Sequence, residues 1–153
     1  AGDDAFSFLP PKAPRGFLAD IDEDSATVLN LYRKLKAAGL NPWMDKKKLL
    51  AGQNWPRAIE KAIRTCDFFV PCFTKRALRK RSRFNSELHL AIECAEMQPI
   101  EEPFIVPVRL EDIAVPSKLA DKMQYVDLIP DFEQGAKHLV SANKSTAHAT
   151  RSS

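Results

Sequence analysis

Residues 41–65, NPWMDKKKLLAGQNWPRAIEKAIRT, predict a short strand, an exposed loop and a helix in succession. The apolar run 41–44 follows Gly39, a residue type that commonly ends helices, and three lysines then place the chain in solvent. Asn54 is a favourable N-cap, and Pro56 fits the first helical turn, where its missing N–H costs nothing. An apolar face follows at helical spacing, formed by Trp55, Ala58, Ile59, Ala62 and Ile63. A charged loop with two leucines, held between a strand and a helix, is a candidate recognition element.

The bulk composition is that of one soluble domain. The 153 residues are 44% hydrophobic and 28% charged, and the net charge of +3 is too small to imply a polyanionic partner. No apolar run approaches the ~18 residues of a membrane span, and no signal peptide is visible. The three cysteines have no metal-ligand spacing with the histidines, so we expect reduced thiols, no metal site and a cytoplasmic protein.

The remaining chain alternates strand and helix patterns. We expect an arm or linker at 1–15, a domain at 16–142 and a flexible polar tail at 143–153. Val28, Leu31, Tyr32 and Leu35 form a helical stripe that ends at Gly39. Apolar strands are predicted at 16–20, 67–73, 104–110 and 124–128, with further helices beginning at Asn85 or Ser86 and at Phe132. Within strand 67–73, Pro71 predicts a bulge or an unpaired ladder group, and 75–83 reads as a basic linker.

Strands separated by helices of ten to fifteen residues indicate βαβ units and a parallel sheet. Right-handed crossovers then give a flavodoxin-like three-layer α/β sandwich with a central five-stranded parallel sheet. Ligands of such sheets bind beyond the carboxyl ends of the strands, where the loops 20–25, 45–54 and 74–86 are expected to meet.

Glu87 is the candidate catalytic residue. We expect it in the first turn of its helix, flanking the buried face, where the helix N-terminus favours an ionised carboxylate. Such a carboxylate can stabilise an oxocarbenium-like transition state, as forms when a glycosidic bond breaks. The spacing alone favours the plainer alternative, an ordinary first-turn glutamate.

The pattern PWxDxxxLLxGxxW at 42–55, followed by an amphipathic helix and CDFFVPCFT at 66–74, resembles a bacterial Toll/interleukin-1 receptor (TIR) domain. In that family the loop after the second strand is called the BB loop. The likeness runs from about Gly16 to Val140, with GFLADIDEDSATVLNLYRKL, RFNSELHLAIE, IVPVRLED and YVDL matching further segments in order.

The resemblance implies an activity. Bacterial and plant members cleave NAD to nicotinamide and ADP-ribose or cyclic ADP-ribose, whereas receptor and adaptor members assemble as scaffolds. The matched catalytic glutamate is Glu87, and NAD is a substrate rather than a cofactor. Enzymatic members often carry an aromatic residue four positions earlier, where this chain has Arg83 beside Phe84. The segment Ala19-Asp20-Ile21 also departs from the family's Ser/Tyr/His-rich segment.

The substrate-binding candidates are accordingly Asp20, Trp43, Asp45, Arg83 and Phe84. Trp43 also fits a strand core, and Asp45 also fits a loop cap. His89 fits a helix surface better than a proton shuttle. The cations between Lys75 and Arg83 fit a solvated basic loop best, with NAD pyrophosphate capture and nucleic-acid contact as alternatives. No aromatic residue is interleaved before Phe84, which makes nucleic acid unlikely as a partner.

Three functions stay open at this point. The first is an NAD glycohydrolase of bacterial defence or virulence that is active on self-association through the loop 45–54. The second is a non-catalytic module that binds other TIR domains through the same loop, and the third is a flavodoxin-like nucleoside transferase. The residues expected to make the association contact are Lys46, Lys47, Lys48, Leu49, Leu50 and Gly52.

Overall fold

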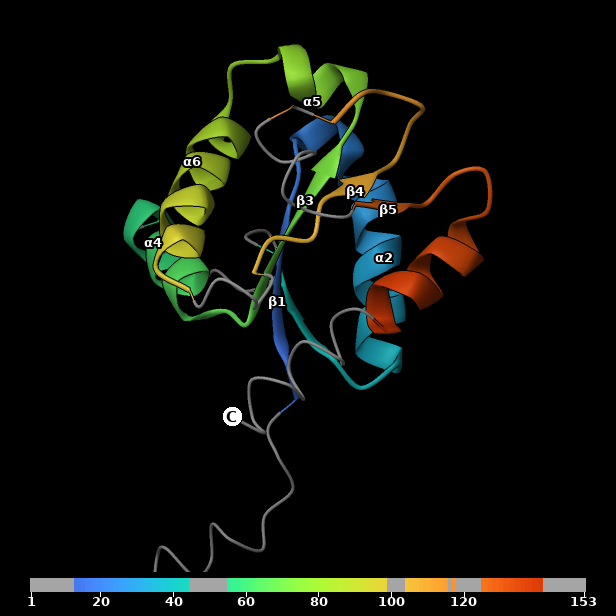
Figure 1. Ribbon diagram of the computed structural model, residues 1–153, viewed down its shortest axis with the longest axis horizontal. Coiled ribbons are helices and arrows are strands. Elements are labelled where there is room, and N and C mark those ends of the chain that lie inside the picture. The colour runs from blue at the N-terminus through green and yellow to red at the C-terminus, as the bar shows by residue number, and fades with distance from the viewer. Residues whose placement is uncertain (1–12, 45–54, 99–103, 116, 118–124, 142–153) are drawn as a thin grey trace, which may run out of the picture.

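The alternating sequence pattern becomes alternating strands and helices in the computed structural model, which describes residues 13–44, 55–98, 104–115, 117 and 125–141 (Figure 1). A final helix spans 132–141. The elements that precede it are β1 (Arg15–Ala19), the 3-10 helix η1 (Asp22–Asp24), α2 (Ser25–Ala37), β2 (Asn41–Trp43), α4 (Trp55–Thr65), β3 (Phe68–Phe73), α5 (Lys75–Arg79), α6 (Arg83–Glu96), β4 (Val108–Arg109) and β5 (Val126–Asp127).

The strands form one parallel sheet in the order β2-β1-β3-β4-β5. This order is the flavodoxin-like one, so the predicted five-stranded parallel sheet is confirmed. All strands point the same way, and their carboxyl ends define one edge of the sheet, which we call the carboxyl edge. The segments that follow β1 and β3 begin there with Asp20 and Thr74.

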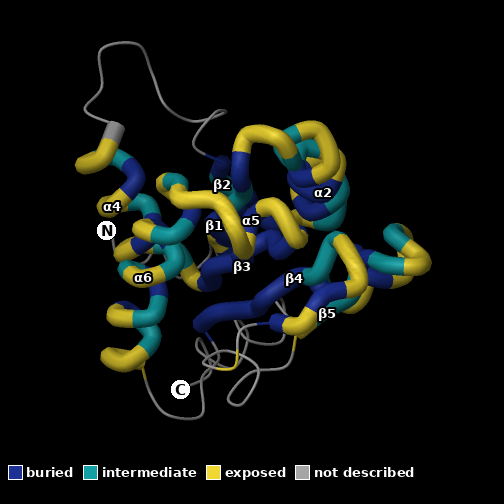
Figure 2. The backbone as a smooth tube through the Cα atoms, turned by 90° about the horizontal axis from the view of Figure 1, so that it is seen from above, coloured by how far each residue is buried: buried dark blue, intermediate teal, exposed yellow. Residues whose placement is uncertain are grey.

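Helices cover both faces of the sheet (Figures 1 and 2). On one face α4 and α6 pack together over Phe17, Phe69 and Phe73, while on the other α2 and helix 132–141 cover Leu18 and Val70. Figure 2 shows β1 and β3 as buried elements between these two helical layers. Side chains alternate between the faces along each strand, so a strand that is apolar throughout contributes side chains to the hydrophobic core on each face of the sheet.

The predicted stripe of α2 is fully buried. Val28, Leu31 and Leu35 are at most 1% exposed, and Tyr32 is 7% exposed. Gly39 ends the helix with a φ of 94°, and the amides of Gly39 and Leu40 donate to the carbonyls of Lys36 and Leu35. The positive φ explains why glycine occupies this position.

Prolines interrupt the pairing of β3 with its neighbour. Phe69 bridges Ile105 and Cys72 pairs with Val108, so the same offset of 36 residues holds on both sides of Pro71. At this offset Pro71 lies opposite Pro107. The ladder therefore lacks only the hydrogen bond that an amide at Pro71 would donate, and its register does not shift, so of the two alternatives predicted at Pro71 the bulge is wrong. The predicted strand 104–110 shortens to a bridge at Ile105 and the two-residue strand β4.

Two further expectations need correction or lie outside the description. The basic segment after β3 is a short helix, α5, rather than a linker, and Thr74 caps it by accepting a hydrogen bond from the Ala77 amide at 3.1 Å. Most of the predicted arm 1–15, the loop 45–54 with its N-cap Asn54, and the tail 143–153 lie outside the described residues. No helix in the described ranges is long and apolar enough to cross a membrane.

Candidate active site

Aromatic rings line the sheet on the face that α4 and α6 cover. The β1–β2 register places Phe17 opposite Trp43, and their rings stack at 4.9 Å with an interplanar angle of 22°. Phe17 also stacks on Phe69 of β3 at 5.4 Å. The indole of Trp43 is half-buried at one end of this three-ring stack, so its role in packing the strand is clear, while its contact with substrate stays a prediction.

Glu87 lies on the buried face of α6 rather than beside it. The buried residues of this helix are Phe84, Glu87, Ala91 and Cys94, and Glu87 is 4% exposed. The helix begins at Arg83, so the prediction that Glu87 belongs to the first turn is wrong: it is the fifth helical residue. The helix-terminus argument for its ionisation therefore loses force, because that effect fades beyond the first turn. His89 is exposed on the outer surface of α6.

Arg83 and Phe84, the other two predicted site residues on α6, have opposite surroundings. Phe84 is 2% exposed and meets the ring of Phe73 edge-on, with ring centres 5.6 Å apart. Arg83 is exposed at the first position of α6. Phe84 thus belongs to the core in this structure, and its proposed stacking on substrate stays a prediction.

The other predicted contacts are placed only in part. Asp20 is half-buried directly after β1, on the carboxyl edge. Asp45 and the association residues 46–52 lie outside the described residues. Among the residues that the structure describes, no group of three His, Cys, Asp or Glu side chains is arranged to hold a metal ion.

A pocket of about 670 Å³ opens at the carboxyl edge, on the side of α2 and β4. One wall is cationic and comes from α5 and its end, with Lys75, Arg76, Arg79 and Lys80. The rest is lined by Asp24, Thr27, Thr74, Leu110 and Glu111. We call this hollow the basic pocket. Of the described residues that were predicted for the active site, none lines it.

Hydrogen bonds fix the walls of the basic pocket. The Thr74 hydroxyl donates to Asp24 Oδ2 at 2.7 Å, and the Lys75 amide donates to Glu111 Oε1 at 2.8 Å. Lys80 Nζ pairs with Glu23 Oε1 at 2.7 Å, and this hydrogen bond lowers the pKa of the Glu23 carboxyl. The contacts tie α5 to the start of α2 and to the segment after β4, so three separate parts of the chain hold the pocket open.

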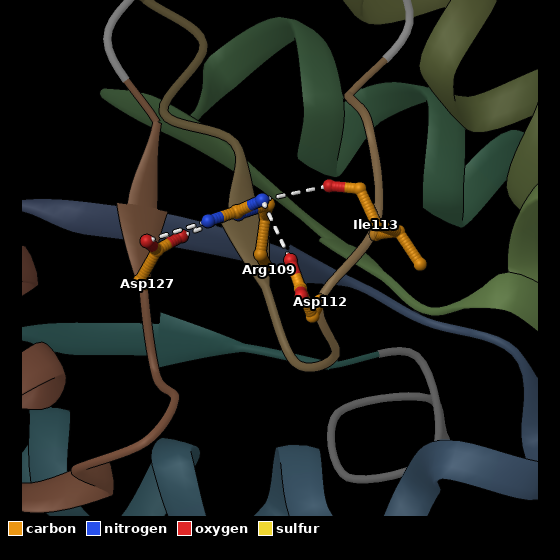
Figure 3. A network of polar contacts seen from close by, with 4 residues as sticks. All are labelled: Arg109, Asp112, Ile113 and Asp127. Carbon is orange, nitrogen blue, oxygen red and sulfur yellow. Dashed lines mark hydrogen bonds and ion pairs between the residues drawn. The ribbon is translucent and has the colours of Figure 1, made fainter.

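Arg109 organises the adjoining corner of the sheet (Figure 3). Its guanidinium binds Asp127 through two hydrogen bonds, Nε to Oδ1 at 2.5 Å and Nη2 to Oδ2 at 2.8 Å, and Nη1 donates to the Ile113 carbonyl at 2.8 Å. The Tyr125 ring lies 4.8 Å from the guanidinium carbon. The hydrogen bond to Arg109 lowers the pKa of Asp127, and the same bond raises the pKa of Arg109. This side-chain fork reinforces two strands of only two residues each.

The cysteines are poor nucleophiles here. All three thiols are free, and burial raises the pKa of Cys66 to about 12 and that of Cys72 well above its ordinary value. A thiolate at neutral pH is therefore disfavoured at both positions, which argues against cysteine chemistry.

A family model described as TIR domain matches residues 19–140. The chain belongs to the TIR family. Among curated proteins, none matches it significantly by sequence.

Solved structures share the TIR fold. The TIR domain of the Toll-related receptor TRR-2 from Hydra magnipapillata is 18% identical, with 82% of this chain and 97% of that chain covered and a TM-score of 0.63. The TIR domains of the activated Roq1 resistosome are 23% identical, with 86% and 84% covered and a TM-score of 0.57. The CMP N-glycosidase BcmB of Clostridium botulinum is 16% identical, with 80% and 96% covered and a TM-score of 0.56. At these identities the likeness concerns the fold alone.

Sequence reasoning missed the basic pocket of this TIR domain. The sequence draws attention to the cations of 75–83 but favours a solvated loop, because a run of like charges does not reveal whether the segment lines a pocket. One signal was present: Thr74, directly after a buried strand, has the right type and position to cap a helix. The partners Asp24 and Glu111 come from distant segments, so no local pattern could have joined them to α5.

Proposed function

We propose that this TIR domain cleaves the glycosidic bond between nicotinamide and ribose in NAD, with Glu87 as the catalytic carboxylate. One observation carries the proposal: Glu87, which the sequence resemblance aligns with the family's catalytic glutamate, is buried on the inner face of α6 at 4% exposure. Helix interiors rarely bury a carboxylate for packing alone, because removing its charge from water is costly.

The chemistry needs little more than a placed negative charge. The bond between C1′ of the ribose and the nicotinamide nitrogen breaks, and its electron pair neutralises the pyridinium. Positive charge then develops on the ribosyl group, and a carboxylate shielded from water stabilises it more strongly than one in solvent. Water adds at C1′ and gives up a proton to form ADP-ribose, or an adenine nitrogen adds to form the cyclic product.

Self-association through the loop 45–54 is part of the proposal. The match to the TIR family supports it, as do the two leucines and three lysines in that loop. An isolated domain in dilute solution would then turn over slowly, so activity has to be measured at high concentration or on a clustering surface. We further propose a role in bacterial defence or virulence, in the cytoplasm, where NAD is available.

The test follows nicotinamide release from NAD by the concentrated domain and its Glu87→Gln variant. We expect the variant to lose about 10²–10³-fold or more of the turnover, the scale on which one electrostatic stabiliser of a transition state acts. Glu93→Gln is the matched control, because Glu93 lies on the exposed face of the same helix and its change should leave turnover unaltered. Turnover of Glu87→Gln within a factor of about two of the parent would refute the assignment.

A second function, a non-catalytic module that binds other TIR domains, is favoured by one observation. The position four residues before Glu87 holds Arg83 instead of an aromatic residue, and the neighbouring Phe84 is packed into the core. Absence of turnover in the clustered domain, together with association that Leu49→Ala/Leu50→Ala weakens, would establish this function instead.

A further inference from the structure

The basic pocket contains more positive charge than the fold itself uses. Four cationic side chains line it against two carboxylates, Asp24 and Glu111. Both carboxylates already accept hydrogen bonds from the chain, from the Thr74 hydroxyl and the Lys75 amide. Both carboxylates are therefore engaged in holding the walls of the pocket together.

Two of the cations are available to a ligand. Lys80 is held by Glu23 at 2.7 Å, but in the described part of the chain no carboxylate forms a hydrogen bond or ion pair with the guanidinium of Arg76 or Arg79. Both residues are exposed and lie three positions apart on α5, so their side chains leave the helix on neighbouring paths. Paired arginine forks of this kind match the oxygens of phosphate groups.

We propose that the basic pocket binds a compact polyphosphate, the group carried by pyrophosphate and by nucleoside triphosphates. Its volume of about 670 Å³ suits a small molecule, for which sites of roughly 300–1,000 Å³ are usual. Thr27, which is exposed and also lines the pocket, adds a hydroxyl to the polar groups of the site. Glu87 does not line the pocket, so this inference is independent of the proposed NAD cleavage.

The lining favours a compact anion over a nucleic acid. None of the described residues around the pocket is aromatic, so the site offers no platform on which a base could stack. The four cations that line the pocket all come from α5 and the residue after it. Recognition therefore concerns the phosphate chain, and the base of a nucleotide contributes little.

The experiment titrates tripolyphosphate into the full chain by isothermal calorimetry. We expect one saturable site, and a loss of affinity of about tenfold or more in Arg76→Glu/Arg79→Glu, since one lost charge-assisted hydrogen bond is worth about that factor. Arg33→Glu/Lys36→Glu is the matched control. It makes the same change of net charge on exposed positions toward the other end of α2, roughly 9–14 Å along the helix axis from Thr27, and should bind as the parent does.

Further titrations compare free tripolyphosphate with a nucleotide that carries the same phosphate chain. ATP should bind with an affinity similar to that of tripolyphosphate, and Arg76→Gln/Arg79→Gln, which introduces no repulsion, should also weaken both. The melting curve of each variant shows whether it is folded. Absence of saturable binding to the parent, or equal weakening by the control pair, would overturn the proposal. A DNA duplex that binds more tightly than tripolyphosphate at equal phosphate concentration would overturn it in favour of nucleic acid.

Discussion

Replacing Phe84 by alanine tests whether the residue beside Arg83 serves the core or the substrate. The side chain is 2% exposed, and its ring meets Phe73 edge-on at 5.6 Å. Truncating a buried phenylalanine costs about 3–5 kcal/mol, of which the aromatic pair accounts for about 0.5–1.5 kcal/mol. For a domain of this size the melting temperature should fall by roughly 6–20 °C, at about 2–4 °C per kcal/mol.

Urea unfolding followed by circular dichroism measures the loss directly. His89→Ala is the control, because His89 is exposed on the same helix and its change should stay within about 0.5 kcal/mol. A loss below about 1 kcal/mol for Phe84→Ala would refute the core assignment. In that case the ring would be free to contact a ligand, and the prediction that it stacks on substrate would regain support.

Three other expectations concern packing, charge and reactivity. Gly135→Ala should destabilise the domain by about 1–3 kcal/mol or more in urea unfolding, because the new Cβ would lie 2.1 Å from the Asp127 carbonyl oxygen; unchanged stability would contradict this close approach. The pKa of Asp127 is lowered by Arg109, so this pair stabilises the fold above about pH 4 and its contribution disappears as the pH falls through the lowered value. Asp127→Asn should therefore flatten the acid side of the stability profile, and an identical profile would argue against the pair. Iodoacetamide at pH 8 should label Cys66 and Cys72 slowly in the native protein and rapidly in urea, since their raised pKa values suppress the thiolate; mass spectrometry distinguishes the two outcomes.

The sequence predicts a helix or strand best where several residues indicate the same element. The stripe of α2 extends over two turns and the helix ends before a glycine with positive φ, and β3 is apolar throughout, so the sequence predicts both correctly. The start of α6 was missed because Asn85 and Ser86 both look like caps. In the structure the Asn85 side chain donates to the Lys80 carbonyl, and the helix already begins at Arg83.

That displacement matters for the candidate site. With the earlier start Glu87 is the fifth helical residue, and it belongs to the buried face and not to its margin. The identity of the residue was available from the sequence, whereas its surroundings depend on how α6 rolls against Phe73 and the sheet. Tertiary packing of this kind decides helix orientation, and the local pattern does not encode it.

The facing prolines Pro71 and Pro107 reduce the hydrogen bonding in the sheet without ending it, because the amides of Val106 and Leu110 still donate to the carbonyls of Phe69 and Phe73. The β1–β3 ladder runs without interruption from Gly16 to Ala19, so β2, β1 and β3 form one hydrogen-bonded unit. Beyond these prolines, β4 and β5 are joined to each other by a short ladder and by the two hydrogen bonds between Arg109 and Asp127. This corner carries Leu110 and Glu111 of the basic pocket. The basic pocket is therefore joined to the central strands through β3, by the Cys72–Val108 and Phe73–Arg109 pairs that lie just beyond the two prolines.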